Sequence, residues 1–345
     1  MAERTDLKSL STEELAAFVT GLGEKAFRAA QLYDWIHVKR VTDLREMSNL
    51  SKAFREKLAE TATICRLETV REQTSAEDGT KKFLFRLPDG NCIESVWMKY
   101  RHGNSVCISS QVGCRQGCAF CASTLGGLVR SLTAAEMLEQ IYAVMRQTGE
   151  RVSNIVVMGI GEPLDNYDAL VKFIRMISDD KGQNISQRSI TVSTCGLVPE
   201  IRRLAEEELS VTLALSLHAV SDEKRRKIMP VANRYRIAEL MDACDAYFRK
   251  TGRRISFEYA LIAGVNDTAE DAAGLSRLAG PRGCHVNLIP VNPVTERGLK
   301  EPDRRAVEAF AGRLKAQGVN ATIRRELGRD IDGACGQLRR KEGQG

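Results

Sequence analysis

The chain has 345 residues, of which 43% are hydrophobic and 28% charged, the composition of a folded globular protein. This composition excludes a disordered chain, a collagen and a coiled-coil rod. No apolar run approaches the roughly 18 residues of a membrane-spanning helix, so we expect no membrane association. A net charge of +6 permits a nucleic-acid partner without requiring one. The N-terminus lacks the apolar core of a secretory signal, so we expect a cytoplasmic protein.

Residues 1–60 are expected to form a small helical domain that can bind RNA. Ser11-Thr12-Glu13-Glu14 has the residue types that start a helix, and apolar residues recur at helical spacing from Ala26 to Ile36. We expect Trp35 in the core of this bundle. Basic residues would leave a face that can contact a phosphate backbone, and they are Lys25, Arg28, His37, Lys39 and Arg40.

Two short strands are predicted next, in a β-hairpin segment that spans residues 61–104. The first covers Lys81–Leu87 and follows the turn residues Glu77-Asp78-Gly79. The second covers Cys92–Met98 and follows Pro88-Asp89-Gly90-Asn91. Glycine in each turn can adopt the positive φ angles that hairpin turns require.

From residue 105 the pattern becomes strand, loop and helix, repeated to about residue 320. The expected strands are rich in Val, Ile and Leu, as strands buried on both faces should be; they are Val106–Ser110, Ile155–Met158, Ser189–Ser193, Thr212–Leu217, Ile255–Leu261 and His285–Ile289. The expected helices are Ala134–Gln147, Tyr167–Ser178, Pro199–Glu207, Ile237–Lys250, Ala269–Leu278 and Asp303–Gln317. Six such units predict an α/β fold, a parallel sheet curled into a partial (β/α)6 barrel. A strand at Ala321–Arg325 opens a polar tail that covers residues 321–345.

Three of the ten cysteines lie within eight residues, at Cys114, Cys118 and Cys121. A structural zinc site requires four ligands, and a fully ligated iron–sulfur cluster requires a fourth cysteine. Three thiolates on a cubane cluster leave one iron open to a substrate. The loop follows the first barrel strand, at the end where barrels carry their chemistry. The remaining cysteines outside the motifs below are interpreted as structural, and they are Cys65, Cys92, Cys195, Cys244 and Cys284.

Other strand ends carry groups that suit a small polar ligand. Glycine lets the backbone approach a ligand closely, and a carboxylate can accept a hydrogen bond from an ammonium group. Ser, His and Asn can hydrogen-bond ribose hydroxyls or a carboxylate. The groups follow the second, third, fourth and sixth barrel strands, and they are Gly161, Glu162, Ser193, Ser216, Leu217, His218 and Asn292. Each alone is a weak signal, but together they surround one mouth of the barrel.

The CxxxCxxC spacing after the first strand of a βα barrel resembles that of the radical S-adenosylmethionine enzymes. The resemblance implies a [4Fe-4S] cluster on Cys114, Cys118 and Cys121 whose open iron binds S-adenosylmethionine. It also implies that the strand-end residues named above bind this cofactor and that Phe120 packs on its adenine.

Further motifs narrow the resemblance to one branch. The chain carries Cys107-Ile108-Ser109-Ser110-Gln111-Val112-Gly113-Cys114, Gly161-Glu162-Pro163-Leu164, Ser216-Leu217-His218 and a tail motif, Gly328-Arg329-Asp330-Ile331-Asp332-Gly333-Ala334-Cys335-Gly336-Gln337-Leu338. These resemble the RlmN/Cfr family of RNA adenosine methyltransferases nearly end to end. Pro163 is typical of the branch that methylates C2 of adenosine, since the C8 branch tends to have alanine there. Gly333 departs from a commoner alanine.

The chemistry at C2 requires a carrier for the methyl group. C2 of adenine has no lone pair that could attack a sulfonium methyl, and a radical that abstracts hydrogen does not deliver methyl. A thiol can accept a methyl group by ordinary substitution. By the resemblance the carrier is Cys335, and two molecules of S-adenosylmethionine are used per turnover. The carrier must visit the barrel mouth, so the segment from Gly328 to Leu338 is expected to be a mobile loop.

The resemblance also assigns the remaining catalytic roles. It makes Glu94 the base for the C2 proton and Cys107 the thiol that takes over Cys335 in a transient disulfide. From the residues alone, Cys107 would be a core cysteine and Glu94 a solvent-facing strand residue.

The implied substrates are an adenosine of large-subunit (23S) ribosomal RNA near the peptidyl transferase centre, free of protein or before assembly, and the adenosine 3′ of the tRNA anticodon. The target base would have to be unstacked. Flavodoxin or ferredoxin is the kind of electron donor expected. Several basic residues could supply phosphate contacts, and they are Arg202, Arg203, Lys224, Arg225, Arg226, Lys227, Arg339, Arg340 and Lys341.

Two other functions stay open on sequence grounds. One is methylation of adenosine at C8. The other is a non-catalytic RNA-binding or ribosome-assembly protein whose cysteines hold a structural metal ion.

Overall fold

The computed structural model describes residues 4–292, 298–325 and 327–331. In this part of the chain one ten-stranded sheet runs in the order β14-β13-β12-β11-β10-β9-β6-β5-β4-β3. Its strands are β3 (Glu68–Thr74), β4 (Lys81–Arg86), β5 (Cys92–Tyr100), β6 (Gly103–Ile108), β9 (Val152–Val157), β10 (Ile190–Thr194), β11 (Thr212–Ser216), β12 (Ser256–Leu261), β13 (His285–Pro290) and β14 (Ala321–Ile323). A small second sheet pairs β7 (Gln111–Gly113) with β8 (Leu128–Ser131).

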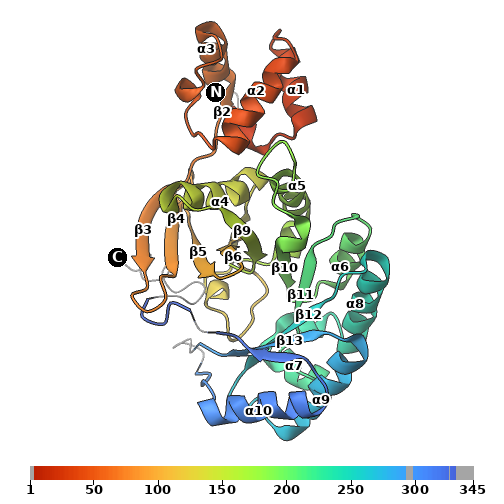
Figure 1. Ribbon diagram of the computed structural model, residues 1–345. Helices are drawn as coiled ribbons and strands as arrows, with labels where there is room; N and C mark the ends of the chain where they lie inside the picture. The colour runs from red at the N-terminus through yellow and green to blue at the C-terminus, as the bar shows by residue number, and fades with distance from the viewer. Residues whose placement is uncertain (1–3, 293–297, 326, 332–345) are drawn as a thin grey trace.

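Neighbouring strands from β6 to β14 are parallel. Helices connect them and cover the outside of the curved sheet (Figure 1). These helices are α4 (Ala134–Thr148), α5 (Tyr167–Ile177), α6 (Val198–Ala205), α7 (Asp222–Ile228), α8 (Ile237–Thr251), α9 (Ala269–Ala279) and α10 (Arg304–Ala316). Because β14 and β3 end the sheet without pairing with each other, the barrel is open. The prediction of a partial α/β barrel with six strand–helix units is confirmed. Helix α7 was not predicted.

The expected hairpin does not stand apart from the barrel, because its strands continue the same sheet. Strands β3, β4 and β5 are antiparallel, and β5 pairs with β6 in a register that places Val96 opposite Cys107. Strand β3 was missed because it is an exposed edge strand with a single apolar residue, Val70, so its hydrophobic signal is weak.

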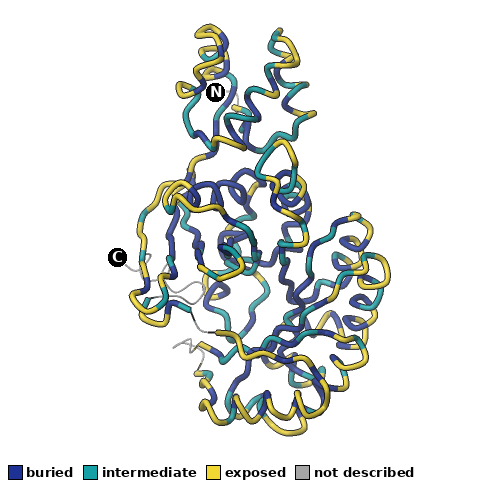
Figure 2. The backbone as a smooth tube through the Cα atoms, in the orientation of Figure 1, coloured by how far each residue is buried: buried dark blue, intermediate teal, exposed yellow. Residues whose placement is uncertain are grey.

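One face of this antiparallel extension packs against the helices. Phe83 and Ile93 join Val106 in the main core, which also contains the buried side of α4. Figure 2 shows the central strands and α4 as largely buried. Since side chains alternate along a strand, Glu94 and Cys107 lie on the opposite face of the sheet, inside its curve.

A separate helical unit precedes the barrel and has a hydrophobic core of its own. It contains α1 (Thr12–Gly21), α2 (Phe27–Tyr33), a π-helical turn (Asp34–Val38) and α3 (Lys52–Thr61), and it is closed by β1 (Thr5–Asp6) pairing with β2 (Ala62–Thr63). A buried ion pair between Lys8 and Glu139 ties this unit to α4, and Lys8 Nζ also donates to Cys65 O at 2.6 Å. Within the described ranges, no helix is long and apolar enough to cross a membrane.

One prediction for the helical unit is confirmed in part, and another is wrong. Trp35 packs against the core of the unit but is only half-buried, because its Nε1 donates to Asn49 Oδ1 at 2.6 Å and Lys39 Nζ lies 3.6 Å from its ring centroid. His37 does not belong to a basic face, because it is fully buried with Nδ1 3.0 Å from Tyr142 Oη. Helical spacing alone does not show whether a tryptophan is fully buried or has a polar edge. It also does not show whether a histidine faces solvent or packs against another helix such as α4.

The burial of His37 predicts a pH dependence of stability. Burial, with a smaller contribution from the positive charge of Lys8, lowers the pKa of His37 to about 3. Between pH 6.5 and 3 the unfolded chain binds a proton that the folded chain does not. The free energy of unfolding should therefore decrease with falling pH in this window, by up to about 1.4 kcal/mol per pH unit for this group.

Urea unfolding of the wild type and His37→Asn at several pH values between 5 and 7 measures this slope. His218 has a similarly depressed pKa and is retained in both proteins, so the difference between the two slopes isolates His37. Equal slopes would contradict the prediction.

Candidate active site

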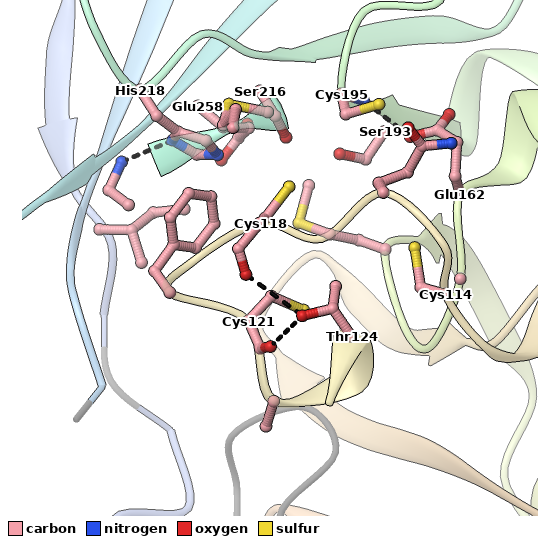
Figure 3. Close-up of a pocket in the computed structure, with 18 of the residues that line it drawn as sticks. Cys114, Cys118, Cys121, Thr124, Glu162, Ser193, Cys195, Ser216, His218 and Glu258 are labelled. Carbon is pink, nitrogen blue, oxygen red and sulfur yellow. Dashed lines mark hydrogen bonds between the residues drawn. The ribbon is translucent and has the colours of Figure 1, made fainter. Parts of the chain in front are cut away.

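A cavity of about 1140 Å³, counting the space at its open mouth, lies at the carboxyl ends of the parallel strands. It is the end of the barrel where sequence analysis placed the site, because parallel strands bring their following loops to one edge. Figure 3 shows the cysteine loop facing the ends of the strands across this space. The predicted site residues that line it are Cys114, Cys118, Cys121, Gly161, Glu162, Ser193, Ser216, His218 and Asn292.

The cysteine loop is held in shape by its own backbone. Cys114 N donates to Gly127 O at 2.9 Å and so closes the loop at its base. Inside the loop, Thr124 Oγ1 donates to Cys118 O at 3.2 Å and to Cys121 O at 2.9 Å (Figure 3). One threonine hydroxyl thus fixes the carbonyls of two cysteine residues, and with them the direction of the loop.

The loop also leans on helix α7. Ala119 N donates to Ile228 O, the last residue of α7, at 2.8 Å. From the same helix Arg225 reaches inward, and it is fully buried. Its NH2 donates to Cys195 O at 2.6 Å and its Nε to Leu217 O at 3.1 Å. The suggestion that Arg225 contacts RNA is therefore wrong. A run of consecutive basic residues on a short helix does not show which of them faces the interior of the protein.

Glu162 is buried at the end of β9, and its carboxylate is held by backbone N–H groups. Oε2 accepts from Cys195 N at 2.7 Å and Oε1 from Leu164 N at 3.1 Å. Burial raises the pKa of Glu162, and these hydrogen bonds oppose the shift. The side chains of Thr194 and Cys195 also hydrogen-bond to this carboxylate, and Glu162 lines the cavity.

Gly161 places this carboxylate by a close backbone approach. Its φ is +111°, and a Cβ there would lie 2.6 Å from Gln111 Cβ and 2.8 Å from Ser110 Oγ. Only glycine avoids both the strain and the clash. The neighbouring Glu162 N donates to Gln111 Oε1 at 2.9 Å. The loop after β9 is thereby locked to the segment that leads into the cysteine loop.

His218 is a neutral hydrogen-bond donor to the cavity. Its Nδ1 accepts from Ala260 N at 2.8 Å, which leaves its ring proton on Nε2. Burial, together with the charge of Arg225, lowers the pKa of His218 to about 3. Its backbone has a φ of +55°, and the Phe120 ring contacts it edge-on with centroids 4.6 Å apart. Phe120 therefore lies in the cavity wall.

The three loop cysteines line one cavity and can supply thiolate ligands to a metal centre. Burial, reinforced by neighbouring negative charge, raises the pKa of Cys114 to about 12 and also raises that of Cys118, so without metal these thiols keep their protons. Metal binding replaces those protons. Among the described residues no three His, Cys, Asp or Glu side chains are gathered around one point. The fit to a cluster therefore rests on the chemistry of the donors, since three cysteines at one cavity can bind three irons and leave a fourth without a protein ligand.

Other predicted residues lie outside the cavity lining. Leu217 is buried in the core beside His218. Glu94 is not solvent-facing as its strand pattern suggested, because it is 4% exposed and its Oε2 lies 3.0 Å from Lys82 Nζ. A buried ion pair on the inner face of a curved sheet produces the same alternation of polar and apolar residues along a strand as a face exposed to solvent.

Cys107 is a half-buried free thiol two positions from Ser109, whose Oγ donates to Glu94 O at 2.7 Å. Burial raises the pKa of Cys107, while Arg324 and the backbone N–H of Met158 oppose the shift. Met158 lines the cavity, so Cys107 lies immediately behind its wall. Cys335 and the tail residues Arg339, Arg340 and Lys341 lie outside the described residues.

Cys195 and Glu258 are among the cavity residues that sequence analysis did not predict. Cys195, which was interpreted as structural, lines the cavity. A usable signal was its place in the Ser193-Thr194-Cys195-Gly196 loop after a barrel strand. Glu258 also lines it, buried in β12 with its Oε1 accepting from Asn287 Nδ2 at 2.9 Å. The signal there was an acidic residue inside an otherwise apolar strand.

Comparison with known families divides the chain into two matched regions. Residues 5–64 match the family described as the ribosomal RNA large subunit methyltransferase N-terminal domain. Residues 108–275 match the radical SAM superfamily. The second region contains the cysteine loop and most of the strand ends that surround the cavity.

Similarity to known proteins extends over nearly the whole chain. A probable dual-specificity RNA methyltransferase RlmN from Lachnospira eligens is 60% identical over 337 residues, which cover 98% of this chain and 96% of the relative. The protein of the same description from Geobacillus thermodenitrificans is 53% identical, covering 97% of this chain and 92% of its own. The crystal structure of a radical SAM methyltransferase from Sphaerobacter thermophilus superposes with a TM-score of 0.92 at 43% identity, covering 96% of this chain and 98% of that one.

The cysteine loop yields a prediction about metal content. Anaerobically reconstituted wild type should contain about four irons per chain. Cys114→Ala, Cys118→Ala and Cys121→Ala should each lose this iron and its visible absorbance. Cys244→Ala is the matched control, because Cys244 is a buried cysteine of α8 outside the cavity lining and should retain the iron. Stoichiometric zinc with no iron in the wild type would show the cluster assignment to be wrong.

Proposed function

The chain belongs to the RlmN family of radical S-adenosylmethionine RNA methyltransferases, and we propose that it methylates C2 of adenosine in 23S ribosomal RNA and tRNA. The observation that carries this proposal is the convergence of the cysteine loop and four strand ends on one cavity. The description of the relatives as dual-specificity RNA methyltransferases supports two kinds of RNA substrate. Pro163 in the Gly-Glu-Pro motif supports C2 over C8.

The residues of the cavity fit an iron–sulfur cluster with bound S-adenosylmethionine. When bound, this pair supplies an adenosyl radical that abstracts a hydrogen atom. In the proposal, Cys114, Cys118 and Cys121 hold the cluster. Glu162 accepts from the amino group of the cofactor, since its carboxylate lines the cavity and is already oriented by two backbone N–H groups.

The remaining strand-end groups would orient the nucleoside part of the cofactor. The Nε2 proton of His218 and the hydroxyls of Ser193 and Ser216 offer hydrogen bonds to polar ligand atoms. Asn292 adds an amide at the sixth strand end. Phe120 presents an aromatic face or edge at the wall, as packing on adenine requires.

Cys335 is proposed to carry the methyl group. Its thiol would accept a methyl group by substitution from one S-adenosylmethionine, and a second S-adenosylmethionine would be consumed in activating that methyl group. The carbon would then bond to C2 of the adenosine and join RNA to protein. Glu94 would remove the C2 proton. The Cys107 thiolate would then attack the sulfur of Cys335, so that an S–S bond forms and the bond from that sulfur to the transferred carbon breaks, and the carbon would keep the electron pair and take up a proton to become the methyl group. The common inward face of Glu94 and Cys107 on neighbouring strands supports this pairing of roles.

RNA contacts are proposed for the helical N-terminal domain and for exposed basic residues near the barrel. Lys25, Lys39, Arg202 and Arg226 are exposed and can neutralise phosphates. A cytoplasmic flavodoxin or ferredoxin would supply electrons, and the reducing cytoplasm would reopen the disulfide.

The proposal is tested by anaerobic incubation with S-adenosylmethionine, reductant and protein-free ribosomal RNA or tRNA, followed by nucleoside analysis. The expected product is 2-methyladenosine. Cys335→Ala should keep its iron and bind S-adenosylmethionine but form no product. In wild type premethylated with unlabelled donor, a deuterated donor should give unlabelled methyl in the first turnover. Finding 8-methyladenosine would instead assign the chain to the branch that methylates C8. Deuterium in the first product would show that Cys335 is not the methyl carrier.

The release step has its own test. Cys107→Ala should methylate Cys335 and attach it to RNA but should not release it, because no second thiol is present. A covalent protein–RNA species should accumulate and be visible on a denaturing gel. Glu94→Gln should stall at the same stage if its carboxylate takes the C2 proton. Cys92→Ala is the control and should turn over normally, because Cys92 is also a half-buried cysteine but lies on β5. Normal turnover by Cys107→Ala would return Cys107 to a core role.

A further inference from the structure

The described start of the C-terminal segment is bound to a distant part of the chain. Asp330 accepts two hydrogen bonds at the turn between β3 and β4, from Ser75 Oγ at 2.6 Å and from Ala76 N at 2.7 Å. In return Gly328 N donates to Asp78 Oδ2 at 2.9 Å. Ser75 and Asp330 are 255 positions apart in the sequence. The tail segment and the β3–β4 turn therefore each contribute one carboxylate, and each carboxylate accepts hydrogen bonds from the other segment.

The turn is organised before the segment reaches it. Ser75 and Thr80 are buried, and Ser75 N donates to Thr80 O at 2.8 Å. Asp78 Oδ1 accepts from Thr80 N at 2.9 Å, which leaves Oδ2 for Gly328. Burial opposes ionisation of Asp78, but hydrogen bonds from Thr80 and Gly328 outweigh it and lower the pKa of Asp78 to about 2. At neutral pH the acceptor is thus fully charged.

Gly328 is shaped for this contact. Its φ is +66°, and a Cβ there would lie 3.0 Å from Ile331 Cγ1 and 3.5 Å from Thr80 Cγ2. Ile331 N donates to Gly328 O at 3.3 Å, so residues 328–331 form a compact turn against the β3–β4 turn. The beginning of the segment expected to be mobile is accordingly anchored.

The anchor lies close in the sequence to the proposed carrier. Cys335 follows Asp330 by five positions. The turn leads directly into β4, whose second residue, Lys82, pairs with Glu94. The anchored segment therefore contacts the turn that precedes β4, and the proposed base on β5 is paired with a residue of β4.

We infer that the Ser75–Thr80 turn is a clamp that positions the segment bearing Cys335, with Ser75, Asp78 and Asp330 as positioning residues. The inference rests on the proposed carrier role of Cys335, but the clamp itself is a physical contact that can be measured without turnover. Its partner is a segment of this same chain. None of the three residues touches the cofactor cavity.

The first test measures the contact itself. In reconstituted protein, Asp330→Ala should increase the hydrogen exchange rate of the peptide that covers residues 327–338 by about fivefold, a moderate factor because Asp330 is exposed and water replaces part of the lost bonding. Asp330→Ala with Asp78→Asn should increase it further. Glu77→Ala is the matched control, since Glu77 is an exposed carboxylate of the same turn whose backbone N alone is seen to bond there. An unchanged exchange rate in Asp330→Ala would overturn the clamp.

The second test asks whether the contact positions the carrier. Methylation of Cys335 by S-adenosylmethionine, followed by mass spectrometry, should slow by about fivefold in Asp330→Ala at saturating cofactor, in step with its exchange rate. The iron content, the KM for S-adenosylmethionine and the urea midpoint should stay at wild-type values, which a general loss of structure would not allow. Faster exchange with a wild-type methylation rate would overturn the positioning role. If wild-type Cys335 is never methylated, the carrier proposal fails, and the exchange measurement still decides whether the clamp exists.

Discussion

The guanidinium of Arg225 is buried among backbone carbonyls at the ends of β10 and β11, and the shape of the cavity depends on it. Buried carbonyls require donors, and one planar side chain supplies several at fixed angles. The same short helix presents Ile228 O to Ala119 N of the cysteine loop. The loop and the strand ends are therefore held by one element, which is how groups far apart in sequence keep one geometry around a ligand.

This frame also sets the protonation and orientation of the polar groups. Burial, with a smaller contribution from the positive charge of Arg225, keeps His218 neutral, and Ala260 N selects its tautomer. Backbone N–H groups meet both oxygens of Glu162. Each side chain is thus oriented before a ligand arrives, which lowers the ordering cost of binding. The fit of these groups to S-adenosylmethionine belongs to the proposed function, while their preorganisation is a property of the fold.

The antiparallel strands β3, β4 and β5 add residues with proposed functions to the parallel barrel. They extend the sheet beyond β6 and bring Glu94 beside Ser109 and close to Cys107 on the inward face. Their β3–β4 turn also receives Gly328 and Asp330 from the far end of the chain. A single addition to the sheet thereby provides a buried carboxylate, supports a thiol and anchors the tail. The two proposed catalytic residues that the structure describes outside the cavity, Glu94 and Cys107, accordingly lie on the neighbouring strands β5 and β6.

The sequence by itself determined the barrel strands, the cysteine loop and the strand-end residues, because strand periodicity and motif spacing are local signals. Parallel topology then brings the carboxyl ends together without further information. Only the tertiary structure decided the environment of Glu94, His37 and Arg225. The sequence pattern around a polar residue on an alternating strand or a short helix is the same whether its side chain faces water or a buried partner. It also decided that Cys195 lines the cavity and that Asp330 meets Ser75. Such contacts join residues far apart in the chain, and no local pattern encodes which distant partner a side chain will meet.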